Sequence, residues 1–182
     1  MSIFNVDLDG VLVDWTDAIA ELFGVDVALA REANRTHRIS EVLGLSKTQM
    51  WDRVMTAGSD LWSNMKVHED AWSVFMQARA LLGDRVRILT APIYHHDCYA
   101  GKARWVMDRL GNETSAITIC RDKWLLAGPG RYLIDDNAEK CHDFESHPYA
   151  IAGGKSILVP RMGDAGRAGA LDQFISAVRA AA

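Results

Sequence analysis

Short apolar runs alternate with amphipathic stretches along much of this chain, and this alternation most strongly constrains its fold. The runs lie at 3–9, 86–92, 116–120, 131–136 and 155–160 and have the length of buried strands. Strands that alternate with helices predict a parallel sheet with right-handed crossovers and with helices on both faces. We therefore expect an α/β, Rossmann-like fold.

The stretch 15–66 differs from the rest of the chain. Its pattern is mostly helical, it contains no convincing strand, and it carries three of the six tryptophans. We interpret it as a small helical cap inserted after the first strand, with residues 1–14 and 67–182 forming the core domain. A chain of 182 residues, 49% of them hydrophobic, suits one globular domain with such an insertion.

Charge and composition exclude several classes of protein. The net charge is −4, from 20 basic and 24 acidic residues, which argues against a nucleic-acid partner. No apolar run approaches the ~20 residues that cross a bilayer, and the N-terminus lacks the pattern of a signal peptide. The three cysteines form no CxxC pair and are expected to be free thiols. We expect a soluble, cytoplasmic protein without membrane association; its oligomeric state stays open, a homodimer being one alternative.

The stretch "NVDLDG" places two carboxylates two residues apart at the end of the first apolar run. Asp7 and Asp9 alternate with apolar residues, so both should point the same way, and Gly10 then marks a turn. Taken alone, the pair fits a metal site, a catalytic pair, or a strand end whose acids simply face water.

Polar residues also follow the other strands. Thr90 ends the second run, Lys123 follows the third, and Asp135 and Asp136 end the fourth. In open parallel sheets, ligands bind outside the carboxyl ends of the strands, so these groups should share one edge. Several carboxylates there would repel one another without a divalent cation, and oxygen ligands favour Mg²⁺ as the cofactor.

Such a group can bind and transfer phosphate. A cation, a lysine and a threonine hydroxyl together suit phosphate oxygens. One carboxylate can then attack phosphorus as a nucleophile. The second can donate a proton to the leaving oxygen and later accept one from water.

The motifs that carry these residues resemble a known superfamily. "DLDGVLVD" resembles the first motif of the haloacid dehalogenase (HAD) superfamily of phosphotransferases, "ILTAP" the second and "LIDDN" the fourth. The order of "GKARWVMDRLG", "ICRDK" and "YLIDD" is similar to that in the 5′(3′)-deoxyribonucleotidase family, over roughly residues 3–14 and 62–140. The resemblance implies a HAD-like fold and a phosphoric monoester hydrolase. Its expected substrates are nucleoside monophosphates, with 5′(3′)-deoxyribonucleotides favoured, and they would be hydrolysed through an aspartyl-phosphate intermediate.

The resemblance also implies roles for individual residues. Asp7 would be the nucleophile and Asp9 the acid/base. The metal ligands would be Asp7, the backbone carbonyl of Asp9, Asp135 and Asp136. The phosphate-binding residues would be Thr90, Ala91, Lys123 and, from its helix, Lys102. Ala91 stands where the family often has a serine, so only its backbone N–H could donate there. Trp15, Trp62 and Ile93 would line the substrate pocket, the tryptophans by stacking on the base.

Two alternatives keep the same chemistry. The substrate could be a sugar phosphate or another small phosphomonoester, because residues of the cap decide that choice. A nucleic-acid 3′-phosphatase is a further alternative, against which the net charge of −4 argues.

Overall fold

The chain divides into two compact units, which are described separately below. The computed structural model describes residues 1–35, 39–111 and 116–182. Unit 1 comprises Met1–Val13, Val67–Pro92 and Asn112–Ala182, and unit 2 comprises Asp14–Lys66 and Ile93–Gly111. Among the described residues, no helix is long and apolar enough to cross a membrane.

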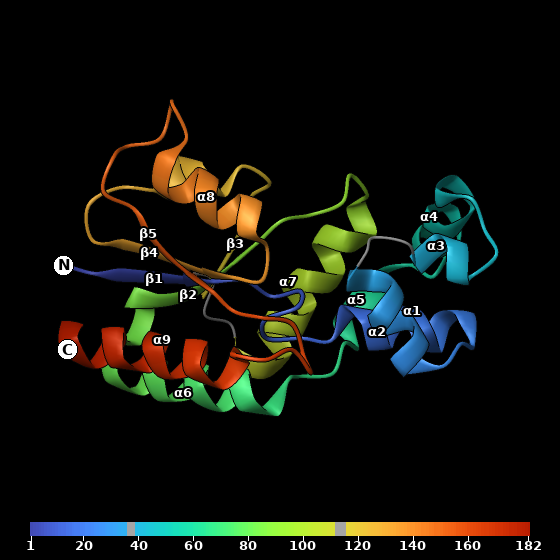
Figure 1. Cartoon of the computed structure of the whole chain (residues 1–182), viewed down its shortest axis with the longest axis horizontal. Coiled ribbons are helices and arrows are strands. Elements are labelled where there is room, and N and C mark those ends of the chain that lie inside the picture. The colour runs from blue at the N-terminus through green and yellow to red at the C-terminus, as the bar shows by residue number, and fades with distance from the viewer. Residues whose placement is uncertain (36–38, 112–115) are drawn as a thin grey trace. The chain divides into compact units, whose positions relative to one another are not determined.

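Unit 1 is built on a five-stranded sheet in which every pair of neighbouring strands is parallel (Figure 1). The strands are β1 (Ile3–Val6), β2 (Val86–Thr90), β3 (Ile117–Ile119), β4 (Arg131–Asp135) and β5 (Lys155–Leu158). Their order is β3-β2-β1-β4-β5. The predicted α/β class and parallel sheet are thus confirmed, and the arrangement is Rossmann-like. Each of these strands ends one to three residues before the predicted apolar run does.

The strand order reverses between β1 and β4. Val6 of β1 pairs with Ile88 on one side and with Ile134 on the other. From β1 the chain builds β2 and β3 outward on one side, and it then returns to place β4 on the opposite side of β1. Such a switch point opens a crevice at the carboxyl ends of the two strands, where ligands bind in open α/β sheets.

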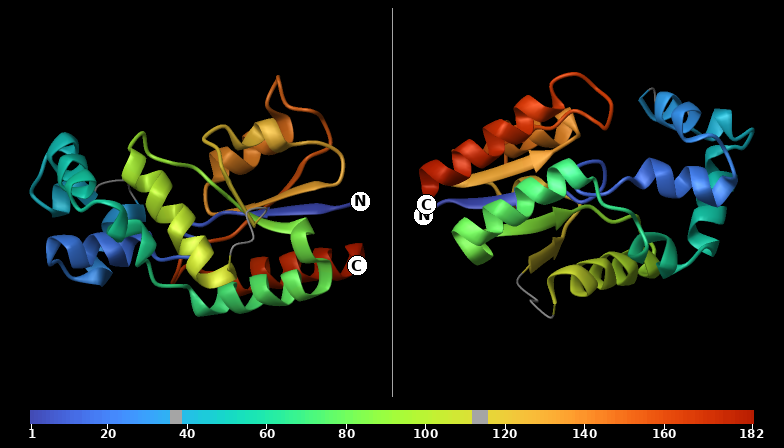
Figure 2. Two further views of the ribbon diagram at one scale, coloured as in Figure 1. Left: turned by 180° about the vertical axis from the view of Figure 1, so that it is seen from behind. Right: turned by 90° about the horizontal axis from the view of Figure 1, so that it is seen from below.

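Helices cover both faces of this sheet. Helices α6 (Glu69–Leu82) and α9 (Arg167–Ala181) lie side by side on one face, and α8 (Ala138–Ser146) lies on the other (Figures 1 and 2). On the α9 face, Phe4 stacks on Tyr132 with ring centroids 4.5 Å apart. On the α8 face, Leu89, Leu133 and Phe144 form a buried cluster. Both faces of the sheet therefore carry apolar side chains, as in other parallel sheets that helices cover on both sides.

Unit 2 is helical wherever the structure assigns regular elements to its described residues. Its helices are α1 (Trp15–Phe23), α2 (Val27–Arg35), α3 (Ile39–Val42), α4 (Lys47–Thr56), α5 (Ser59–Ser63) and α7 (His96–Leu110). Local signals set several of their ends. Asp14 caps α1 by accepting from the N–H of Asp17, and Ser46 and Gln49 form a capping box on α4.

The predicted cap boundaries differ from this division at one helix. The cap was expected at 15–66, of which residues 36–38 lie outside the described residues. The structure groups 93–111 with that segment, because α7 packs on α5. The two helices approach closely at Gly101, where an added Cβ would lie 2.3 Å from the carbonyl oxygen of Ser59.

Candidate functional site

Asp7 lies directly after β1 at the switch point of the sheet. Its backbone N–H donates to the carbonyl of Ile134, which continues the pairing with β4 by one residue. The side chain is buried, and its Oδ1 accepts a hydrogen bond from the N–H of Leu8 at 2.8 Å. The backbone hydrogen bond to β4 and the hydrogen bond from Leu8 thus hold the Asp7 carboxylate at the carboxyl end of the sheet.

Lys123 joins Asp7 to the neighbouring strand end. It begins the 3₁₀ helix η3 (Lys123–Leu126), is 2% exposed, and lies 2.7 Å from both Asp7 Oδ1 and Asp135 Oδ2 through its Nζ. Burial alone would lower the pKa of Lys123, but the two carboxylates outweigh that effect and raise it. The ammonium therefore stays charged and ties two acids from different strands together.

The two acids of "LIDDN" are held differently. Asp135 ends β4, and its Oδ1 accepts from the N–H of Asn137, whose own side chain caps α8. Asp136 accepts from Arg161 Nε at 3.0 Å. It also lies against Gly10, where φ is +83° and an added Cβ would be 2.5 Å from Asp136 Oδ2. Any other residue at position 10 would therefore disturb this carboxylate as well as the turn.

Three carboxylates converge at this point. Asp7, Asp135 and Asp136 can each offer an oxygen so that all three oxygens lie within 4.8 Å of one another. Burial, together with the charges of Asp135, Asp9 and Asp136, raises the pKa of Asp7 to about 8 even though Lys123 opposes the shift. The carboxylates are thus incompletely neutralised by the side chains around them.

A metal ion would fit this donor set. Burial and the neighbouring Asp135 also raise the pKa of Asp136, and Arg161 opposes the shift. A divalent cation between the carboxylates would favour their ionised forms. Because the donors are all carboxylate oxygens, the cluster suits a hard cation such as Mg²⁺ better than a thiolate- or imidazole-binding metal.

The other predicted residues of unit 1 lie on the same edge of the sheet. Strand β1 ends at Val6, and Asp9 lies in the turn that follows. The strand alternation that was expected to point Asp7 and Asp9 the same way therefore does not reach Asp9. Its charge nevertheless contributes to the raised pKa of Asp7. Thr90 is the last residue of β2 and is fully buried, and Ala91 follows it in a half-buried position.

The remaining predicted residues belong to unit 2. Lys102 is buried within α7, and Trp62 is 2% exposed in α5, with Gly101 of α7 against it. Trp15, at the start of α1, is half-buried, and its ring centroid lies 6.0 Å from that of Trp51. Ile93 is half-buried before α7. Trp62 is thus a core residue of its unit, whereas Trp15 keeps part of its surface accessible.

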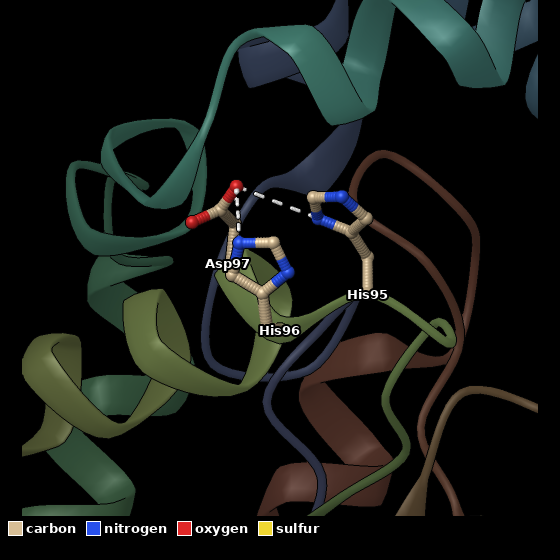
Figure 3. Close-up of side chains that lie close together, drawn as sticks. All are labelled: His95, His96 and Asp97. Carbon is tan, nitrogen blue, oxygen red and sulfur yellow. Dashed lines mark ion pairs between the residues drawn. The ribbon is translucent and has the colours of Figure 1, made fainter.

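A second cluster lies at the start of α7. Figure 3 shows His95, His96 and Asp97 with their side chains converging, and a ring nitrogen of each imidazole lies near Asp97 Oδ2, at 3.5 and 3.6 Å. The three residues are consecutive at the start of the helix, so their proximity follows from their positions in the chain.

Sequence reasoning missed three polar residues around the acids of unit 1. Arg161 comes shortly after β5, so the rule that located the acids at strand ends could also have located it. Asn137 follows the acids at a helix N-cap, which is a recognisable signal. Arg167, described below, has no local signal, because most of its partners are distant in the sequence.

Comparison with other proteins adds no assignment. No model of a known protein family matches this chain, and no curated protein matches it in sequence. The site must therefore be interpreted from its own geometry and chemistry.

Proposed function

We propose that this chain is a Mg²⁺-dependent phosphatase of nucleoside monophosphates that works through an aspartyl-phosphate intermediate. The observation that carries the proposal is the buried Lys123, 2.7 Å from both Asp7 and Asp135, beside a third carboxylate at the switch point of a parallel sheet. Burying charged side chains costs free energy. Buried ionisable groups with strongly shifted pKa values cluster at functional sites, which supports a catalytic role for this network.

Asp7 is suited to act as the nucleophile. Among the described residues, both partners of its carboxylate, Leu8 N–H and Lys123 Nζ, contact the same oxygen, Oδ1. The orientation of the carboxylate is therefore set through one oxygen, and Oδ2 remains for attack on phosphorus. Mg²⁺ held by Asp7, Asp135 and Asp136 would reduce the repulsion between this carboxylate and an anionic phosphate.

The proton transfer is proposed for Asp9, from the resemblance to the HAD superfamily. In the first step, an Asp7 oxygen bonds to phosphorus, the bond from phosphorus to the ester oxygen breaks, and Asp9 gives its proton to that leaving oxygen. In the second step, water attacks the phosphorus of the aspartyl-phosphate, and Asp9 takes the proton of the water. The products are an alcohol and inorganic phosphate, and Asp7 is regenerated.

The nucleotide substrate is proposed from the resemblance to the deoxyribonucleotidase family, with unit 2 as the HAD-type cap. The accessible part of Trp15 supports a stacking role, since nucleobases bind aromatic faces. The acidic net charge of −4 favours a small substrate over a polynucleotide.

The test is phosphate release from 5′- and 3′-(deoxy)ribonucleoside monophosphates, sugar phosphates and an aryl phosphate, each with Mg²⁺ and with chelator. We expect turnover on deoxynucleotides that chelator abolishes and Mg²⁺ restores. Turnover spread evenly over sugar phosphates would support the mechanism but contradict the proposed nucleotide substrate. No release from any compound would overturn the proposal.

A further inference from the structure

Arg167 is a buried arginine with every donor occupied. It is the first residue of α9 and is 5% exposed. A guanidinium has five N–H groups, and all five have partners here. Nε donates to Asp70 Oδ2, Nη1 to the carbonyls of Gly10 and Pro160, and Nη2 to the carbonyl of Val11 and to Asp70 Oδ1, at 2.8–3.3 Å.

Two of these partners belong to the turn that carries Asp9. Within the turn, the N–H groups of Leu12 and Val13 both donate to the carbonyl of Leu8, and the N–H of Gly10 donates to the carbonyl of Val13. The carbonyls of Gly10 and Val11 are instead held by Arg167. Because the guanidinium is planar and its N–H directions are fixed, it constrains where the turn lies.

The other partners anchor the turn to the rest of unit 1. Asp70 lies in the first turn of α6, and Pro160 directly precedes Arg161, which holds Asp136. Gly10, in the same turn, lies against that same Asp136. One side chain thus links the turn after β1, the start of α6 and the segment that holds a carboxylate of the acidic cluster.

We propose that Arg167 is a positioning residue for proton transfer, which keeps the turn of Asp9 where this acid can reach the leaving oxygen. The inference rests on the proposed function, in which Asp9 protonates that oxygen. Proton transfer requires donor and acceptor to lie within hydrogen-bond reach, so a turn that shifts loses the general acid while Asp7 keeps its place in the sheet.

Leaving groups distinguish this role from a merely structural one. An alkoxide leaving from a nucleoside monophosphate needs a proton, whereas the phenolate of p-nitrophenyl phosphate leaves without one. Arg167→Met should therefore lower kcat/KM for the nucleotide by about 10²-fold, the usual contribution of a general acid, and leave kcat/KM for p-nitrophenyl phosphate little changed. Arg167→Lys keeps the positive charge but loses the planar set of N–H donors. Its kcat/KM for the nucleotide should lie between the values of the wild type and of Arg167→Met.

A double-mutant cycle tests whether Arg167 acts through Asp9. Asp9→Asn should show the same selectivity between the two substrates, and adding Arg167→Met to it should cost little more. The matched control is Arg85→Met, which removes a half-buried arginine bonded to the carbonyl of Ala181 and should leave both substrates unchanged.

Each outcome bears on the inference. Equal losses on both substrates, or additive losses in the double variant, would overturn it and leave the proposed function standing. A wild-type protein that hydrolyses neither substrate would overturn both. Circular dichroism establishes that each variant is folded; if Arg167→Met is not, Arg167→Lys and Asp70→Asn provide the same comparison, and a selective loss on the nucleotide in these variants supports the inference.

Discussion

A buried ion network of unit 1 and an exposed ion pair of unit 2 differ in how their charged side chains are held. In unit 1, Asp7, Lys123 and Asp135 come from three distant segments and meet in a buried network. In unit 2, the ion pair of Arg104 with Asp60 joins side chains that are each more than half exposed. Exposed pairs contribute about 0–1 kcal/mol, whereas a buried network loses several kcal/mol when one partner is removed. The buried network of unit 1 should therefore be much more sensitive to the loss of one partner than this exposed pair of unit 2.

The largest effect expected from this comparison concerns catalysis. Asp7→Asn removes the proposed nucleophile and should lower phosphate release on the order of 10⁴–10⁶-fold, as loss of a nucleophile does in other enzymes. The control Asp97→Asn makes the same change in the acidic and histidine cluster of unit 2 and should leave turnover unchanged. If Asp7→Asn retained activity, the buried network would not be the active site.

The next effect concerns stability. Lys123→Met leaves Asp7 and Asp135 without their shared cation and should cost about 3–5 kcal/mol. Arg104→Met, in the exposed pair of unit 2, should cost no more than about 1 kcal/mol. Urea unfolding followed by circular dichroism measures both values. Similar losses in the two variants would remove the distinction between the units.

Two tryptophans of unit 2 sharpen the comparison within that unit. Trp62 is 2% exposed, so Trp62→Ala should destabilise the protein by about 3–5 kcal/mol. Trp15 is half-buried, and if it stacks on a base, Trp15→Ala should raise KM for nucleotides about tenfold and leave KM for p-nitrophenyl phosphate unchanged. Thermal denaturation and steady-state kinetics on both variants separate the roles. An unchanged nucleotide KM in Trp15→Ala would favour a substrate without a base.

The smallest effect concerns pH. Burial by itself would raise the pKa of Asp70, but hydrogen bonds from Arg167 and from the N–H of Ala71 outweigh it and lower this pKa below its ordinary value of about 3.9. Ionised Asp70 therefore stabilises the fold at pH values above that ordinary pKa. This contribution is lost as the pH falls through the folded-state pKa.

Asp70→Asn should accordingly lower Tm at pH 7, by an amount equivalent to about 1 kcal/mol or less because the carboxylate is partly exposed. The difference from wild type should shrink as the pH falls below about 4. Asp84→Asn, at an acid of unit 1 that is 71% exposed, is the control and should show little offset at any pH. A constant offset for Asp70→Asn would mean that its ionisation is not the cause.

Short elements show the limit of what patterns predict. The strands were located because their apolar runs are continuous. Helix α8 was not predicted: only Cys141 and Phe144 are buried in its nine residues, which is too few to show a period. The membership of α7 in unit 2 was also missed, since it depends on contact with α5.

The sequence by itself determined the class of fold and the edge at which the acids would gather. Both follow from local properties: apolar runs specify strands, the connections make them parallel, and parallel strands present their carboxyl ends together. Only the tertiary structure decided that Lys123 lies between Asp7 and Asp135, and that Arg167 binds the carbonyls of Gly10, Val11 and Pro160. Most of those contacts join residues far apart in the chain, and no local pattern encodes the side-chain packing that brings them within hydrogen-bond distance.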